Sequence, residues 1–199
     1  SAFDGTSMWD TDKTSITSPL TSGSRSLDYS YAGTSLVAGT TYYWRMSFWD
    51  SNDGEGSWST TSTFVMSGPP SKPTNLKTDA QTNPTQLASA HPMFSATYSD
   101  PNADDSSAYE IEVNAASNFL GTVMWDTGKT AKTITSGTTG DIANYEGTPL
   151  SNSTTTYYWR IRFWDTDDTE SEWSDTAQFS DFYPSFKFEG LGLEGLKIN

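Results

Sequence analysis

Hydrophobic and polar side chains alternate along several short stretches of the chain, which is the pattern of half-buried β-strands. The longest stretch, TYYWRIRFWD at residues 156–165, is bounded by polar turns. One of its faces carries Tyr157, Trp159, Ile161 and Phe163, and the other carries Tyr158, Arg160, Arg162 and Trp164. We expect the first set to lie in a hydrophobic core. The second set, joined by Trp173 from the next strand, predicts an outer structural ladder in which guanidinium groups stack on aromatic rings.

Six other stretches predict shorter strands. They lie at residues 75–78, 91–98, 109–113, 123–125, 142–145 and 173–179, and segments rich in Gly, Asn, Asp, Ser and Thr separate them. None shows the 3.6-residue periodicity of an amphipathic helix. Short strands joined by polar turns are typical of an all-β protein, so we predict an antiparallel β-sandwich.

The longest strand has a near copy earlier in the chain, TTYYWRMSFW at residues 40–49 against TTYYWRIRFW at 155–164. The eight tryptophans form four pairs with offsets of 115 or 116 residues: Trp9 and Trp125, Trp44 and Trp159, Trp49 and Trp164, and Trp58 and Trp173. A repeat of this length is the size of a small domain. The first residues align with the sequence from Ser117 onward, which predicts one complete module preceded by the C-terminal half of another.

The repeat divides the chain into four predicted parts. Residues 1–67 form the half-module, residues 68–73 a proline-rich linker, residues 74–183 the complete module and residues 184–199 a strand-like tail. We expect the half-module to expose the side chains that its counterpart buries, at a cost of about 1.5 to 3 kcal/mol for each large one. These side chains are Tyr42, Trp44, Met46 and Phe48.

Two explanations account for the cover that such an apolar face requires. In one, the front half of the first module lies upstream in a longer polypeptide. In the other, a neighbouring copy of the chain donates strands from its tail, and the resulting head-to-tail contacts build a fibre. The candidate assembly residues alternate along the tail: Phe186, Phe188, Leu191, Leu193, Leu196 and Ile198. The second explanation predicts self-association.

Charge and composition exclude several classes of partner. The chain has 25 acidic and 11 basic residues and a net charge of -14, which repels nucleic acid and anionic membranes. It contains no cysteine, and therefore no disulfide, thiolate metal ligand or cysteine nucleophile. No apolar run approaches the roughly 18 residues of a membrane span. We predict an extracellular or cell-surface protein that does not insert into membranes.

The motif YYWRIRFWD, followed by Trp173 and Ser174, resembles the last two strands of fibronectin type III modules in bacterial extracellular proteins. The resemblance covers residues 70–183 as a whole module and residues 1–66 as the back half of another. It implies an immunoglobulin-like sandwich of about seven strands, in which Tyr157 would form a corner hydrogen bond. It implies little about activity, because such modules serve as spacers, adhesins and accessory domains.

The same resemblance places two acidic loops at one end of the sandwich. One loop carries Asp100, Asn102, Asp104 and Asp105, and the other carries Asp165, Asp167, Asp168 and Glu170. Convergent carboxylates with an amide suit calcium, which takes about six to eight oxygen ligands. The alternative is a solvated loop end without a metal, and no other cofactor is expected.

No constellation of residues predicts an enzyme. The chain has no Ser, His and Asp set, no zinc-ligand spacing and no phosphate-binding loop, and its carboxylate pairs lack the cleft that glycoside hydrolysis needs. Our first hypothesis is a non-enzymatic extracellular structural protein, a surface fibre or adhesin-like stalk of tandem modules. The alternative is an accessory module of a larger secreted glycosidase, in which the ladder would be a platform for a glycan or cell-surface ligand.

Overall fold

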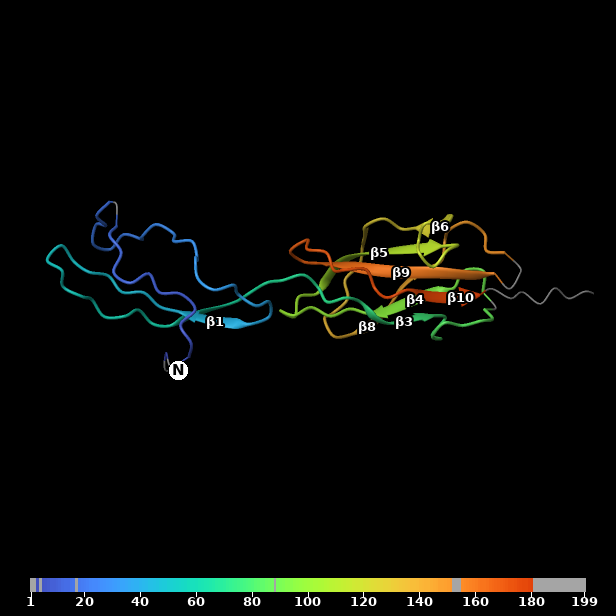
Figure 1. The fold of residues 1–199 in the computed structure, drawn as a ribbon, viewed down its shortest axis with the longest axis horizontal. Helices are drawn as coiled ribbons and strands as arrows, with labels where there is room; N and C mark the ends of the chain where they lie inside the picture. Colours follow the sequence, from blue (N-terminus) through green and yellow to red (C-terminus); the bar gives the residue numbers. More distant parts are fainter. Residues whose placement is uncertain (1–2, 4, 17, 88, 152–154, 181–199) are drawn as a thin grey trace, which may run out of the picture.

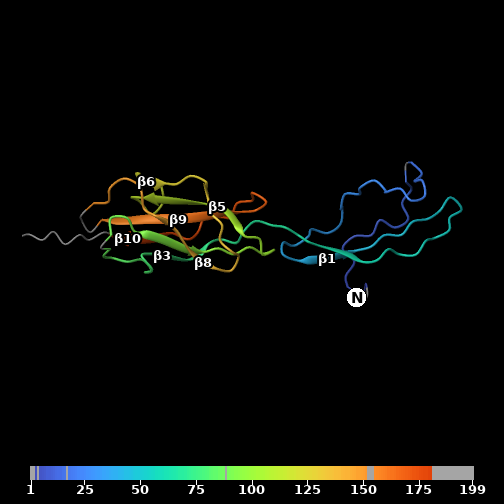
Figure 2. The ribbon, with the colours of Figure 1, turned by 180° about the vertical axis from the view of Figure 1, so that it is seen from behind.

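The computed structural model describes residues 3, 5–16, 18–87, 89–151 and 155–180. These residues form two units that follow one another along the long axis of the molecule (Figure 1). We call residues 3–66 the N-terminal unit and residues 74–180 the C-terminal unit, and residues 67–73 join them. The view from behind shows the same arrangement (Figure 2).

The described residues form ten β-strands and no helix. The N-terminal unit contains β1 (Thr41–Trp44) and β2 (Ser62–Val65). The C-terminal unit contains β3 (Thr74–Thr78), β4 (Met93–Thr97), β5 (Ser106–Asn114), β6 (Val123–Asp126), β7 (Thr130–Ala131), β8 (Thr139–Asn144), β9 (Thr156–Asp165) and β10 (Ala177–Ser180).

The C-terminal unit is a sandwich of two antiparallel sheets. One sheet has the order β10-β9-β5-β6, with the short β7 also paired to β5, and the other has the order β3-β4-β8. Strand β9 lies at the centre of its sheet, where it pairs with β5 on one side and with β10 on the other. The predicted all-β antiparallel sandwich is confirmed.

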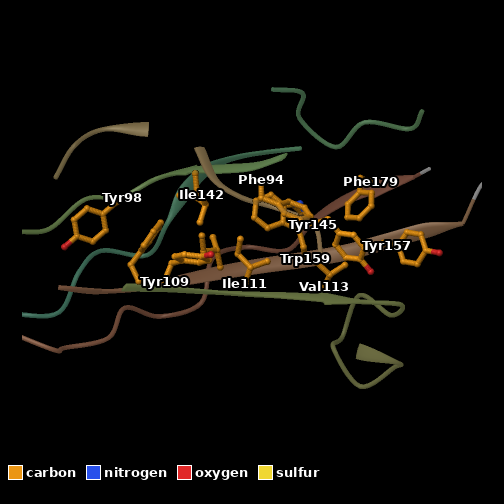
Figure 3. Packing of buried hydrophobic residues seen from close by; sticks show 14 of the residues in the cluster. Phe94, Tyr98, Tyr109, Ile111, Val113, Ile142, Tyr145, Tyr157, Trp159 and Phe179 are labelled. Atoms are coloured by element: carbon orange, nitrogen blue, oxygen red, sulfur yellow. The ribbon is translucent and has the colours of Figure 1, made fainter. Parts of the chain in front are cut away.

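The core of this unit lies between the two sheets, and aromatic rings make up much of it (Figure 3). Phe94 of β4 contacts Trp159 of β9, with ring centroids 4.6 Å apart, and Phe179 of β10, with centroids 5.8 Å apart. Farther along, the ring of Tyr98 meets that of Phe163 edge to face at 5.2 Å. The four side chains assigned to the core from the alternation in β9 are all buried. The parity of this strand therefore predicted its inner face correctly.

Several observed strands differ in their bounds from the predicted ones, such as Ser106–Asn114 against residues 109–113 and Thr139–Asn144 against residues 142–145. The last strand begins at Ala177 rather than at residue 173, because the Ser174 side chain accepts the hydrogen bond of the Ile161 N–H at 3.0 Å in place of a neighbouring strand. Strand β7 was not predicted, since two residues show no alternation. Trp164 lies beside Arg162 on the outer face and is only 7% exposed, because two cationic side chains cover its ring.

The N-terminal unit repeats the last hairpin of the C-terminal unit without the strands that cover it. In β1 and β2, Tyr42 pairs with Phe64, as Tyr157 pairs with Phe179 in β9 and β10. The large hydrophobic residues that remain exposed in the described chain lie almost entirely in this unit, Trp44 among them. The tail residues predicted to donate strands lie outside the described residues.

Candidate functional site

The outer face of β9 carries the ladder of arginine and aromatic side chains. The guanidinium carbon of Arg160 lies between the rings of Phe119 and Trp173, at 4.2 and 4.3 Å from their centroids. The guanidinium of Arg162 lies between Trp164 and Trp173, at 4.8 and 4.7 Å. These distances are within the range of favourable cation–π contact. Tyr158, the remaining predicted member, belongs to the same face of β9.

Carboxylates of β5 complete the ladder, and sequence patterning alone did not identify them. In the β5–β9 register, Glu112 lies opposite Arg160 and Glu110 lies opposite Arg162. The arginine Nη2 atoms reach these carboxylates at 2.6 and 2.7 Å, and Arg162 Nη1 also reaches Glu170 at 2.9 Å. Cross-strand opposition of unlike charges, visible once the register is known, is the signal that would have found them. Both arginines of the ladder are therefore already ion-paired within the protein, and the ladder links β9 to β5.

Two of the residues predicted to bind calcium accept hydrogen bonds from the backbone of their own loops. Asp100 Oδ1 accepts hydrogen bonds from the backbone N–H groups of Asn102 and Asp104 at 2.8 and 3.4 Å. Asp165 Oδ1 accepts from the N–H of Thr169 at 2.8 Å. Both carboxylates thus close Asx-type turns after a strand.

The other predicted calcium ligands also have partners. Asn102 Nδ2 donates to Asp104, Asp105 accepts from the N–H of Ser136, Asp167 accepts from Ser67 Oγ, Asp168 pairs with Lys129, and Glu170 pairs with Arg162. Within the described ranges, no group of three or more acidic or histidine side chains is placed to hold a metal ion. The loops do lie at one end of the sandwich, beside the linker, but calcium binding stays a prediction.

Three buried polar atoms gather near this end of the sandwich. Asp100 Oδ2, Asp165 Oδ2 and the Tyr98 hydroxyl are buried and have no hydrogen-bond partner among the described residues. Burial raises the pKa of Asp100, and the charges of Asp104 and Asp165 act in the same direction, while the two backbone N–H groups lower it. Burial and the same carboxylates raise the pKa of Tyr98. The end next to the linker is therefore electrostatically strained as well as acidic.

A groove beside the linker is lined by Asn75 and Leu76 of β3 and by residues 175–177 at the approach to β10, and it contains no aromatic side chain. The described residues also include no helix capable of crossing a membrane. This groove thus offers neither a stacking surface for a sugar nor an acid–base pair.

Comparison with known proteins assigns the fold to a family. A family model described as Rha78A-like, N-terminal immunoglobulin domain matches residues 4–68 and again residues 73–181. The two matched segments account for most of the chain, and the chain belongs to this family. The match supports an immunoglobulin-like fold, whereas the finer assignment to tandem fibronectin type III modules stays a prediction.

The relatives found by sequence are large glycosidases. The chain is 33% identical over 111 residues to an alpha-L-rhamnosidase of Alteromonas sp. (strain LOR), covering 53% of this chain and 11% of that protein. It is 31% identical over 102 residues to an alpha-L-rhamnosidase of Formosa agariphila, covering 51% and 10%. The crystal structure of Streptomyces avermitilis alpha-L-rhamnosidase complexed with L-rhamnose is 27% identical, with a TM-score of 0.49 and coverage of 56% and 10%.

The chain thus spans about a tenth of the length of the curated relatives it matches. The matched family is an N-terminal immunoglobulin domain and the match covers only a small part of those enzymes, so the chain itself is not catalytic. These findings favour the accessory module of a glycosidase over the structural fibre, which was the first hypothesis from sequence.

Proposed function

We propose that this chain is the accessory immunoglobulin-like region of a secreted alpha-L-rhamnosidase, built from fibronectin type III-like modules. The observation that carries the proposal is the double match to the rhamnosidase domain family, together with two rhamnosidase relatives above 30% identity. We propose the domain boundaries 1–67, 68–73, 74–183 and 184–199. We also propose an extracellular location, supported by the similarity to the two rhamnosidases.

The structure of the C-terminal unit suits a rigid accessory role. Its core contains several large fully buried rings, and each such ring stabilises the fold by a few kcal/mol. The ion-paired ladder braces β9 against β5 on the opposite face of the same sheet. A domain held from both faces of its central strand can position a neighbouring catalytic domain or shield part of its surface without changing shape.

A domain graft tests the accessory role directly. The immunoglobulin-like domain of the Streptomyces avermitilis enzyme is replaced by residues 69–181 of this chain, and a deletion of that domain serves as the baseline. Hydrolysis of an aryl alpha-L-rhamnoside and the melting temperature are measured. We expect the graft to keep kcat/KM and melting temperature near those of the intact enzyme, and the same graft carrying Trp159→Ala to fall toward the deletion. A folded graft that behaves like the deletion would contradict the proposal.

Glycan binding through Trp164 finds no support in the geometry. Lys129 and Arg162 each lie 4.8 Å from the centroid of this ring, and the residue is only 7% exposed. A sugar would need to displace cations that are themselves paired to carboxylates. We therefore expect a glycan array to give the same profile for the parent chain and for Trp164→Phe.

Calcium binding and self-association keep their separate tests. Calorimetric titration with calcium in metal-free buffer tests calcium binding. Both a binding heat and a raised melting temperature are expected if the acidic loops bind the ion.

Sedimentation of the chain with and without residues 184–199 tests self-association. Unchanged assembly after that deletion would reject strand donation by the tail.

A further inference from the structure

The N-terminal unit exposes the rings that the C-terminal unit buries at equivalent positions. Trp44 is 46% exposed against 0% for Trp159, and Phe48 is 44% exposed against 0% for Phe163. On the neighbouring strand, Phe64 is 41% exposed against 0% for Phe179. Contiguous exposed apolar surface of this kind marks an interaction site on a folded protein.

The local backbone of this face is already in its final arrangement. Ser59 N–H donates to Met46 O at 2.8 Å, as Ser174 N–H donates to Ile161 O at 2.8 Å. The Tyr42 hydroxyl accepts from the N–H of Val37 at 2.8 Å, as the Tyr157 hydroxyl accepts from Ser151 at 2.9 Å. The face is therefore preformed, and a partner would not need to order the hairpin on binding.

The C-terminal unit shows what covers such a face. Strand β5 pairs along the second edge of β9, with Val113 opposite Trp159 and Ile111 opposite Ile161. Strand β4 contributes the rings that pack on the inner face, Phe94 on Trp159 and Tyr98 on Phe163. Strand β3 pairs with β4 and completes the cover. Among the described residues, β1 pairs only with β2, so its other edge is open.

Charge defines the partner further. Arg45 lies between the rings of Phe3 and Trp58, 4.3 Å from each centroid, as its counterpart Arg160 lies between Phe119 and Trp173. Arg160 also pairs with Glu112 of β5, whereas no carboxylate of the described chain forms an ion pair with Arg45. The guanidinium is held in position for an acid that the covering strand must supply.

The next residue on the same face, two positions along the chain, does not require a charged partner. Ser47 stands where Arg162 stands in the second unit, and its hydroxyl is buried without a partner among the described residues. A covering strand equivalent to β5 would thus need one acidic residue opposite Arg45 and a hydrogen-bonding side chain, not a second acid, near Ser47.

We propose that the open face of residues 41–66 is a docking surface for a three-stranded β-segment with the alternation of β3, β4 and β5. Its third strand pairs antiparallel with the free edge of β1 and places a carboxylate against Arg45. This is β-strand addition in which the backbone gives affinity and the acid fixes the register. The inference does not depend on the assignment to rhamnosidases, because it follows from the internal comparison of the two units.

The probe is a polypeptide with the sequence of residues 69–118 and the change Glu110→Gln. It carries all three covering strands together with Glu112, and it places an amide instead of a second acid opposite Ser47. It is titrated into the full chain, and amide hydrogen exchange locates the change. We expect slower exchange at residues 41–48 and a blue shift of tryptophan fluorescence as the exposed indoles are covered. The same segment joined ahead of residue 3 as a fusion provides an intramolecular version that remains informative if the free polypeptide aggregates.

A charge swap makes the test specific. Arg45→Glu should weaken binding by at least about tenfold, and a probe carrying Glu112→Arg should restore it toward the original affinity. Arg25→Glu is the matched control, since Arg25 is an exposed arginine of the same unit paired with Asp28, and it should leave binding unchanged.

Three results would overturn the proposal. The first is unchanged exchange at residues 41–48 with both the free probe and the fusion. The second is binding that is indifferent to the charge at Arg45. The third is a dimer of the chain alone that protects residues 41–48 whatever the residue at position 45, because a second copy would then be the occupant of the face.

Discussion

The two units of this protein carry the same hairpin in two environments. The register of β1 with β2 matches that of β9 with β10, and a second pair of tyrosine hydrogen bonds also repeats, from Tyr31 to Thr34 O at 2.6 Å and from Tyr145 to Thr148 O at 2.5 Å. Burial does not repeat, since Trp159 is covered and Trp44 is not. Local sequence therefore determines turns, corners and register, whereas burial depends on strands that come from elsewhere.

The difference also appears in the length of the strands. Strand β9 is ten residues long and β1 is four, although their sequences are nearly identical. The residues of β9 beyond Trp159 pair with β5, and the equivalent residues after Trp44 have no such neighbour in the described chain. A strand thus extends as far as it finds partners, which is a tertiary property and not a propensity.

The largest expected effect comes from removing the indole that is buried in one unit and exposed in the other. Trp159→Ala should destabilise the C-terminal unit by about 3 to 5 kcal/mol, because it leaves a large cavity beside Phe94. Trp44→Ala should change stability by less than about 1 kcal/mol. Urea unfolding followed by circular dichroism measures both, and equal losses would show that Trp44 is buried in solution.

The second contrast concerns the paired and the unpaired arginine. Arg160→Ala leaves the nearly buried Glu112 carboxylate without its cation, and we expect a loss of about 2 kcal/mol after allowance for the partial exposure of the pair. Arg45→Ala removes only stacking on two rings and should cost less than about 1 kcal/mol. The same unfolding measurement applies, with Glu112→Gln as the control that should recover part of the loss in Arg160→Ala.

The third contrast tests whether the hydrogen bonds to the Tyr157 and Tyr42 hydroxyls contribute equally to the stability of their units. Tyr157→Phe removes the acceptor of the Ser151 N–H and should cost about 1 kcal/mol, and Tyr42→Phe should cost about the same in its own unit. Thermal unfolding of the two variants is the measurement. A loss confined to Tyr157→Phe would mean that the N-terminal hairpin is not formed without its cover.

The smallest effect is a pH dependence at the acidic loops. Because the pKa of Asp100 is raised in the folded state, its ionised form opposes folding above that pKa. Asp100→Asn keeps the oxygen that accepts from Asn102 and removes the charge, so it should raise the melting temperature at pH 7. The gain should shrink as the pH falls toward 3, where the parent Asp100 is protonated in both states.

Asp50→Asn is the matched control for this prediction. Asp50 closes the same kind of turn, accepting from the N–H groups of Asn52 and Gly54 at 2.9 and 2.8 Å, but it is exposed. We expect its replacement to leave the melting temperature unchanged across the same range. A gain at Asp100 that does not fall with pH would indicate an effect other than the buried charge.

Much of the fold could be predicted from the sequence, because strand parity and repeats are local properties. The inner face of β9 and the bounds Thr156–Asp165 followed from alternation alone. The candidate site was harder, since the partner of Arg160 is Glu112, 48 residues away, and only the sheet register brings them together. The acidic loops were identified as a group from the sequence. Composition does not show, however, that one carboxylate oxygen of Asp100 accepts a hydrogen bond from the backbone of its own loop.

Amide hydrogen exchange on the unmodified chain tests the central claim most directly, because it compares the two hairpins in one sample. We expect strong protection across residues 156–165, where β10 pairs with the first four residues of β9 and β5 pairs with the rest of it. We expect weak protection across residues 41–48 beyond the few amides bonded to the neighbouring strand. Equal and strong protection of both segments would contradict this claim, because the N-terminal face would then already be covered.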